Sequence, residues 1–333
     1  MDISTLCIHG SDDNTHRTGS VSVPIYQSAT FAHPSVGEST GYDYSRLQNP
    51  TREQLEKTVA GLEKGADAIA FSTGMAAITA MMELFAPGDH IIASDDLYGG
   101  SHRLFQHIST KNGITFDYVD TSDLSAVTSR IRPETKAVFI ETPTNPMMQV
   151  SDIAAISAVT KKNGLLLIVD NTFLTPYYLN PLELGADIVI HSGTTYLSGH
   201  NDTPAGFLAV KEEVLSEKLR FIYKTTGACL SPFDSWLIIR GIKTLAVRME
   251  KQQSNALEVA AWLQKQRKVK KVHYIGLPEH PGHQISLAQG RGFGAMISFE
   301  VDSWHTAVRI LERVGLILYA ESLGGVETLI TYP

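Results

Sequence analysis

Residues 137–170 read AVFIETPTNPMMQVSDIAAISAVTKKNGLLLIVD. Short apolar runs at residues 137–140 and 165–169 enclose a segment at residues 151–162 whose apolar residues have helical spacing. This alternation is typical of a parallel βαβ unit, in which strands covered on both faces are apolar along their whole length. The stretch therefore predicts an α/β fold with a mostly parallel sheet.

The same pattern continues on both sides of this stretch. Further apolar runs predict strands, and segments with helical patterning lie between them. The predicted strands are residues 67–71, 90–93, 116–119 and 188–190, with residues 207–210 as one more, and the predicted helices are residues 75–85, 101–111 and 124–131. We therefore expect a large domain over residues 56–245, with helices on both faces of its sheet.

The two ends of the chain differ from this middle part. Residues 1–55 are rich in Ser, Thr, Gly, Tyr and His with little periodicity, and they predict an extended arm, rather than a packed unit, that reaches a neighbouring subunit. Residues 246–333 predict a smaller α+β domain. It follows a long helical stretch at residues 232–267, divided near Gly241, and its expected elements are strands at residues 292–301, 316–319 and 328–331 and a helix at residues 305–314.

Composition limits the classes of binding partner and the cellular compartment that we expect. The net charge is -7, and the short basic stretch RKVKK at residues 267–271 predicts a solvated helix end, so we expect no nucleic-acid partner. Two cysteines, Cys7 and Cys229, without a C-x-x-C pattern, favour a reducing compartment. Because no signal peptide opens the sequence and no apolar run approaches the roughly 20 residues of a spanning helix, we expect a cytoplasmic protein without a membrane partner.

Polar residues follow several predicted strands, where open parallel sheets bind ligands. Gly74 and Met75 open a helix after the strand at residues 67–71, so their N–H groups suit a phosphate, although an ordinary strand-to-helix turn has the same pattern. Tyr98 follows the next strand and suits either stacking on a planar ligand or a half-buried loop position. Asn145 stands between two prolines, which favours a fixed amide or a simple turn.

A carboxylate and two hydroxyls end the last predicted parallel strands. Asp170 directly follows the strand at residues 165–169, where a carboxylate is costly to bury without a cationic partner. A protonated pyridine nitrogen is such a partner, and a helix N-cap is the alternative. Ser192 and Thr194 follow the strand at residues 188–190, and their hydroxyls suit phosphate oxygens.

Histidines offer a weaker alternative, a metal site. His200 and Asp202 lie close in sequence, as do His280 and His283. Neither pair has neighbours that complete a ligand set, so we expect no metal, and exposed loop positions explain the second pair.

Several motifs occur in a fixed order along nearly the whole chain. They are YSRLQNPT (residues 44–51), STGMA (72–76), DLYGG (96–100), ETPTNP (141–146), VDNTF (169–173), LGADIVIHS (184–192) and ESLGG (321–325). Together they resemble the Cys/Met-metabolism family of pyridoxal-5′-phosphate (PLP) enzymes, which includes cystathionine γ-synthase, the cystathionine lyases and the O-acetylhomoserine sulfhydrylases. This resemblance implies the aspartate-aminotransferase-like fold of PLP-dependent transferases and a homotetramer assembled from tight dimers.

The resemblance also implies how PLP is bound. Gly74 and Met75 would donate backbone N–H groups to its phosphate, and Ser192 and Thr194 would add hydroxyls. Asp170 would pair with the pyridinium nitrogen, which keeps the ring able to withdraw electrons.

Other family positions concern the ring, the neighbouring subunit and the substrate. Tyr98 would stack on the ring, and Asn145 would lie near its phenolic oxygen or the substrate. Tyr44 and Arg46 would reach the phosphate of the adjacent subunit, so that the site is shared between subunits. The remaining implied contacts are those of an amino-acid substrate with Glu321, Ser322 and Leu323.

Two departures from the family pattern stand out. The family motif Ser-x-Thr-Lys-Tyr begins here at Ser192, and Thr195 occupies the place of the Schiff-base lysine. A hydroxyl forms no Schiff base and is not basic near neutral pH, and losing proton transfer alone costs roughly 10² to 10⁴ in rate. The family also continues some tens of residues past the part matching residues 322–333, to an arginine that binds the substrate carboxylate, so we expect an incomplete C-terminal domain.

Two functional hypotheses follow. The first is a trans-sulfuration enzyme that makes or breaks a C–S bond, either by γ-replacement on an O-acylhomoserine or by lyase-type elimination; ESLGG and the final ITYP look closer to the γ-synthases and sulfhydrylases than to the β-lyases. The second, which Thr195 favours, is a catalytically silent PLP-binding homologue. An unrelated nucleotide-binding α/β fold would leave the ordered motifs unexplained.

Overall fold

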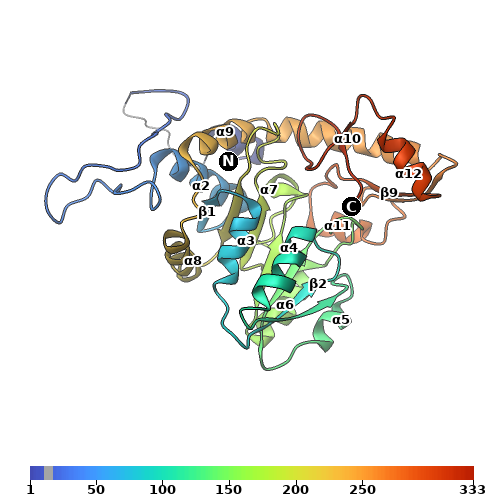
Figure 1. The fold of residues 1–333 in the computed structure, drawn as a ribbon, viewed down its shortest axis with the longest axis horizontal. Helices are drawn as coiled ribbons and strands as arrows, with labels where there is room; N and C mark the ends of the chain where they lie inside the picture. The colour runs from blue at the N-terminus through green and yellow to red at the C-terminus, as the bar shows by residue number, and fades with distance from the viewer. Residues whose placement is uncertain (11–17) are drawn as a thin grey trace.

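The computed structural model describes residues 1–10 and 18–333, and a seven-stranded sheet lies at its centre (Figure 1). The strand order is β1-β7-β6-β5-β4-β2-β3. The strands are β1 (Asp67–Phe71), β2 (His90–Ser94), β3 (Thr115–Val119), β4 (Thr135–Glu141), β5 (Leu166–Asp170), β6 (Ile188–Ser192) and β7 (Gly206–Val210). The pairs β2–β3, β2–β4, β4–β5 and β5–β6 are parallel, whereas β7 is antiparallel to β1 and β6. The predicted, mostly parallel sheet is confirmed.

Helices cover both faces of this sheet. Leu167 and Val169 of β5 point into one apolar core and Ile168 into the other, which explains why the strand is apolar at successive positions. The first core receives side chains from α2 (Pro50–Glu63), α5 (Leu124–Ser129), α6 (Ile153–Asn163), α9 (Pro232–Ile242) and α10 (Leu245–Leu263). The second receives them from α3 (Gly74–Met82), the π-helical turn η1 (Phe105–Ser109) and α8 (Glu213–Thr226).

The N-terminal segment is only partly an extended arm. The prediction that it contains no packed unit is wrong for α1 (Ile3–His9), which Asp2 caps by accepting a first-turn N–H at 3.1 Å. Cys7 of this helix is buried in the core that α2 and α10 also form. Residues 11–17 of the predicted arm lie outside the described part of the chain. Residues 18–48 contain no helix or ladder strand, and they loop out from the body in Figure 1.

Beyond α10 the chain forms a smaller α+β part. β8 (Val269–His273) pairs antiparallel with β9 (Ser298–Val301), and β10 (Leu318–Tyr319) pairs parallel with β11 (Leu329–Ile330). The remaining helices of the chain are α4 (Gly99–Leu104), α7 (Thr175–Tyr178), α11 (His283–Gln289) and α12 (Trp304–Leu311). The predicted break near Gly241 is confirmed by the boundary between α9 and α10. Across the described ranges, no helix is both long enough and apolar enough to cross a bilayer.

Two predictions for this part are wrong. Residues 267–271 do not end a helix, because α10 ends at Leu263 and the last three of them already belong to β8, where they pair with β9. The strand expected at residues 292–301 begins only at Ser298. Gly294 has a φ of 66°, a left-handed conformation that interrupts an extended strand.

Candidate functional site

The start of α3 lies directly against the end of β6. A Cβ added to Gly74 would lie 3.2 Å from both Cα and Cβ of Ser192. A Cβ on Gly206, which pairs with Ser192 in the β6–β7 ladder, would lie 2.1 Å from the carbonyl oxygen of Thr73. Only glycine fits this contact, and the structure brings the predicted phosphate-binding residues Gly74 and Ser192 together.

Thr172 connects Asp170 to the contact between Gly74 and Ser192. The N–H and hydroxyl of Thr172 donate to Asp170 Oδ1 at 3.0 and 2.5 Å. The Thr172 hydroxyl oxygen also accepts the N–H of Ser192 at 2.9 Å. The carboxylate, the turn at the end of β6 and the start of α3 therefore form one connected edge of the sheet. Thr172 was not singled out from the sequence, since its role depends on the pairing of β5 with β6.

Glu141, at the end of β4, lies opposite Asp170 in the β4–β5 ladder. Burial raises the pKa of Asp170, and hydrogen bonds from Thr172 partly oppose the rise. Burial, and then the charge of Asp170, raises the pKa of Glu141 well above its ordinary value. Neither carboxylate forms an ion pair with Lys, Arg or His in the part of the chain that the structure describes. The charge of His191 lowers the pKa of Asp170, but that imidazole is paired with Glu63, so among the described residues this edge has no directly paired cation, and a protonated ring nitrogen would supply one.

Glu141 also positions two predicted site residues. The N–H of Tyr98 donates to Glu141 Oε2 at 2.9 Å, and the backbone N–H of Asn145 bonds to the same carboxyl group. A Cβ on Gly100 would lie 2.4 Å from Tyr98 Cε1 and 3.0 Å from Met75 Sδ, so ring and thioether meet above this glycine. Glu141 was missed in the sequence, although the argument used for the carboxylate at the end of the next strand applies to it equally.

Thr195 is enclosed. Its side chain donates to the carbonyl oxygen of Ser192 at 2.7 Å, and the residue is 8% exposed. Gly324 covers it from the other side, since a Cβ there would lie 3.0 Å from the carbonyl carbon of Thr195 and 2.8 Å from the nitrogen of Tyr196. The hydroxyl proton is therefore used in a backbone hydrogen bond and is not directed at a ligand.

A cavity of about 540 Å³ opens beside Thr194. Glu321 and Ser322 line it, whereas Leu323 packs against the apolar core. The oxygen of the Thr194 hydroxyl accepts the N–H of Ala205 at 3.0 Å. Ser322 has a φ of 90°, and a non-glycine residue in such a conformation costs of order 1–3 kcal/mol, a strain that is concentrated at functional sites. Among the described residues that line this cavity there is no lysine.

Tyr44 and Arg46 lie elsewhere in this chain. The guanidinium carbon of Arg46 is 5.6 Å from the centroid of the Tyr44 ring, and Arg46 donates to the carbonyl oxygen of Lys224 in α8. Within the described ranges, neither residue hydrogen-bonds to Gly74 or Ser192. That these two residues reach the cofactor phosphate of an adjacent subunit stays a prediction.

The histidines considered as metal ligands have other contacts, and the exposed loop position expected for the second pair is wrong for His283, which begins α11 and is buried. His200 Nδ1 lies 2.8 Å from the carbonyl oxygen of Ser198, and His283 Nδ1 lies 2.8 Å from that of Ile275. No group of three or more His, Cys, Asp or Glu residues that could hold a metal occurs within residues 1–10 and 18–333.

Comparisons with known proteins agree with this geometry. Residues 4–333 match the family described as Cys/Met metabolism PLP-dependent enzyme. Cystathionine γ-lyase of Bacillus subtilis (strain 168) is 49% identical over 333 residues, which is 100% of this chain and 88% of that protein. Cystathionine γ-synthase/O-acetylhomoserine (thiol)-lyase of the same strain is 52% identical over 316 residues, 95% of this chain and 80% of that protein. The crystal structure of cystathionine γ-lyase from Lactobacillus plantarum complexed with L-serine superposes with a TM-score of 0.97 at 44% identity, covering 99% of this chain and 87% of that one.

Proposed function

Because the chain belongs to the Cys/Met metabolism family of PLP-dependent enzymes, we propose that it is built to make or break a C–S bond of a sulfur amino acid. The proposed substrates are cystathionine, for elimination, and an O-acylhomoserine, for γ-replacement. The observation that carries the proposal is the connected edge formed by Gly74, Asp170, Thr172 and Ser192, where Asp170 and the neighbouring Glu141 form no ion pair with any described Lys, Arg or His.

The residues of this edge divide into a phosphate end and a ring end. The N–H groups of Gly74 and Met75, at the positive end of α3, would bind the phosphate together with the hydroxyls of Ser192 and Thr194. Asp170 would accept a hydrogen bond from the protonated ring nitrogen and keep the proton on that nitrogen, because a neighbouring positive charge stabilises a buried carboxylate. When bound, PLP supplies an electron sink for negative charge on the substrate Cα.

The remaining roles concern orientation and assembly. Tyr98 would lie against the ring and Asn145 beside its phenolic oxygen, both held by Glu141. Tyr44 and Arg46, in the N-terminal segment at residues 18–48 that contains no helix or ladder strand, would complete the phosphate site of a neighbouring copy in a dimer of dimers. Two free cysteines agree with a cytoplasmic location.

Thr195 favours a second candidate, a PLP-binding homologue without turnover. Its hydroxyl donates to the carbonyl of Ser192, so at this position the chain has neither an amine nor a base that could move a proton to or from the substrate. In this candidate the phosphate and ring contacts are retained and the chemistry is lost.

Absorbance titration with PLP, followed by assays with cystathionine and with O-acetylhomoserine plus cysteine, tests both candidates. We expect saturable PLP binding by the unmodified chain and by Thr195→Lys, with turnover at least about 10² to 10⁴ faster in Thr195→Lys. PLP binding by Thr195→Lys without turnover of either substrate would favour the silent homologue. Failure of both proteins to bind PLP would contradict the proposed site.

A further inference from the structure

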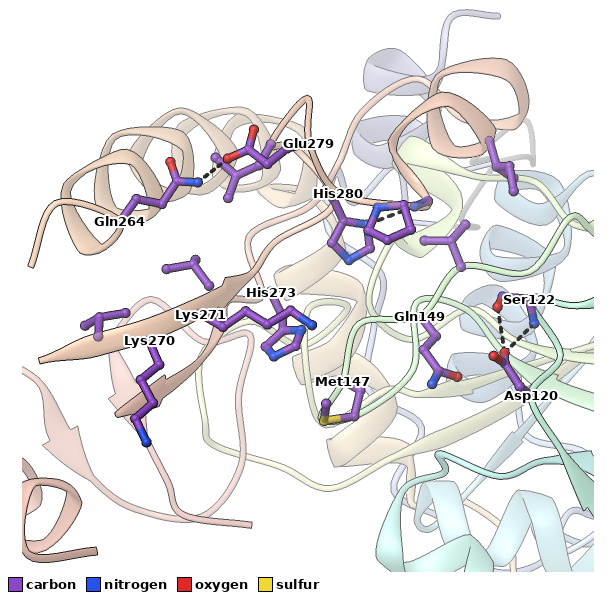
Figure 2. A pocket seen from close by; sticks show the side chains of 17 residues that line it. Asp120, Ser122, Met147, Gln149, Gln264, Lys270, Lys271, His273, Glu279 and His280 are labelled. Carbon is purple, nitrogen blue, oxygen red and sulfur yellow. Dashed lines mark hydrogen bonds between the residues drawn. The ribbon is translucent and has the colours of Figure 1, made fainter. Parts of the chain in front are cut away.

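A larger cavity, of about 710 Å³, lies between the C-terminal part and the loops that follow β3 and β4 (Figure 2). In the described part of the chain, this cavity shares no lining residue with the one beside Thr194. The structure brings two motifs together here that the proposed function does not use, the basic stretch at residues 267–271 and the histidine pair at residues 280–283. The cavity therefore needs an explanation of its own.

One wall of the cavity carries hydrogen-bond donors and positive charge. Lys271 of β8 points across the cavity in Figure 2, and it forms no ion pair within the described ranges. His280 lines the same cavity, and its Nδ1 accepts the N–H of Gly282 at 3.1 Å. Burial, and then the neighbouring His273 and Lys271, lowers the pKa of His280 to about 4. Because Nδ1 accepts this N–H, Nε2 of the neutral imidazole carries the proton and can donate to a carboxylate, while Lys271 supplies the positive charge.

The opposite wall carries acceptors and negative charge. Asp120 Oδ1 accepts the N–H and the hydroxyl of Ser122 at 2.9 and 2.6 Å, which leaves Oδ2 without a hydrogen-bond partner among the described residues. Gln149 Oε1 is buried and has no partner there either. Burial and the charge of Asp120 raise the pKa of Asp95 nearby. An ammonium group would satisfy both free oxygens.

The charges on the two walls together indicate which class of ligand the cavity fits. The lining contains Lys270 and Lys271 but also Asp120 and Glu279, so the formal charges balance and favour neither a simple anion nor a simple cation. A volume of about 710 Å³ is in the range of small-molecule sites.

We propose that this cavity binds a zwitterion, a small molecule with an ammonium group at one end and a carboxylate at the other. Asp120 and Gln149 hold the ammonium group, and Lys271 and His280 hold the carboxylate. The N–H of Gln149 donates to Thr144 Oγ1 at 2.9 Å, so the ligand contacts the loop that also carries Asn145. This site is separate from the candidate cofactor site and does not depend on PLP.

Calorimetric titration of the full chain with two ω-amino acids of different length, 4-aminobutyrate and 6-aminohexanoate, tests the proposal. Hexanoate and hexylamine are matched controls that carry one charge each. We expect saturable binding of at least one of the ω-amino acids, about tenfold tighter than either control, because each control leaves one wall unpaired.

Substitutions of residues that line the cavity test whether the ligand binds there. Lys271→Ala and Asp120→Asn should each weaken it about five- to tenfold, whereas Lys268→Ala should leave it unchanged, because Lys268 does not line the cavity. Asp120→Asn keeps an acceptor for Ser122, and an unchanged melting temperature would show that the fold is intact. Three results would each overturn the proposal: no saturable binding, hexanoate binding as tightly as 6-aminohexanoate, or binding unaffected by both variants.

Discussion

Glu63 Oε1 lies 2.6 Å from His191 Nε2, and both side chains are buried. Asn171 Nδ2 donates to the same glutamate oxygen at 3.0 Å. His191 and Asn171 immediately neighbour Ser192 and Asp170, so one carboxyl group on α2 holds the ends of two strands that carry the candidate site. This cluster acts on function by fixing the positions of Asp170 and Ser192.

Removing this carboxyl group should destabilise the protein strongly. We expect Glu63→Ala to lower the free energy of unfolding by about 3–5 kcal/mol, because it leaves a buried imidazole and one of the two N–H groups of the buried Asn171 amide without a partner. Urea denaturation measures the loss. The matched control is Glu183→Ala, which breaks an exposed ion pair of 2.7 Å with Lys64 and should cost less than about 1 kcal/mol. Equal losses in the two variants would contradict the buried role of Glu63.

Gly206 and Gly99 should respond oppositely to alanine. In Gly206→Ala the new Cβ would lie 2.1 Å from the carbonyl oxygen of Thr73, so we expect the turn before α3 to shift, with a stability loss of about 1–3 kcal/mol and weaker PLP binding. Nothing lies within 4 Å of a Cβ on Gly99, and Gly99→Ala in α4 should be neutral or stabilising by up to about 1 kcal/mol. Thermal melts and PLP titration compare the two variants, and a tolerated Gly206→Ala would show that the contact is not tight.

Asp170 should make the PLP-free protein less stable as the pH rises. Because burial raises its pKa in the folded state, the folded protein binds this proton more readily than the unfolded chain does. Stability is then lost as the pH rises from the ordinary carboxyl value of about 4 through the raised folded value. Asp170→Asn removes the buried charge, and urea denaturation at several pH values should find this variant more stable than the unmodified chain at pH 7.

Asp170→Asn should weaken the binding of PLP, although it should stabilise the PLP-free protein. The ring nitrogen loses a charged hydrogen-bond partner of about 1.5–3 kcal/mol, so we expect PLP affinity to fall about ten- to a hundredfold in an absorbance titration. Asn at this position still accepts the hydrogen bonds from Thr172. An Asp170→Asn variant that is less stable without PLP and binds PLP normally would exclude the proposed pairing.

The sequence predicted the central strands well because strands covered on both faces are apolar at successive positions. It did not predict the direction of β7, since a run such as residues 207–210 has no directional signal and the direction follows from the connection to β6. It missed α1 because seven residues are too few for a clear helical period. The domain boundaries at residues 55 and 245 stay predictions.

The site was predicted in part. Gly74, Asp170 and Ser192, which the sequence singled out as small and polar residues at strand ends, lie together in the structure, and their binding of PLP, with that of Thr194, stays a prediction. Glu141 was missed although its strand-end position is the same as that of Asp170, whereas the cavity in Figure 2 depends on the fold bringing distant segments, such as those of Asp120 and Lys271, to opposite walls.

The central claim is that Thr195 stands where PLP would otherwise form its bond to the protein. The most direct test is borohydride reduction of the chain with PLP, followed by peptide mass spectrometry, for the unmodified chain, for Thr195→Lys and for Thr128→Lys on the exposed side of α5 as a matched control. We predict a single stoichiometric PLP adduct at residue 195 in Thr195→Lys and no selective adduct in the other two. A stoichiometric adduct at one lysine of the unmodified chain would contradict the claim.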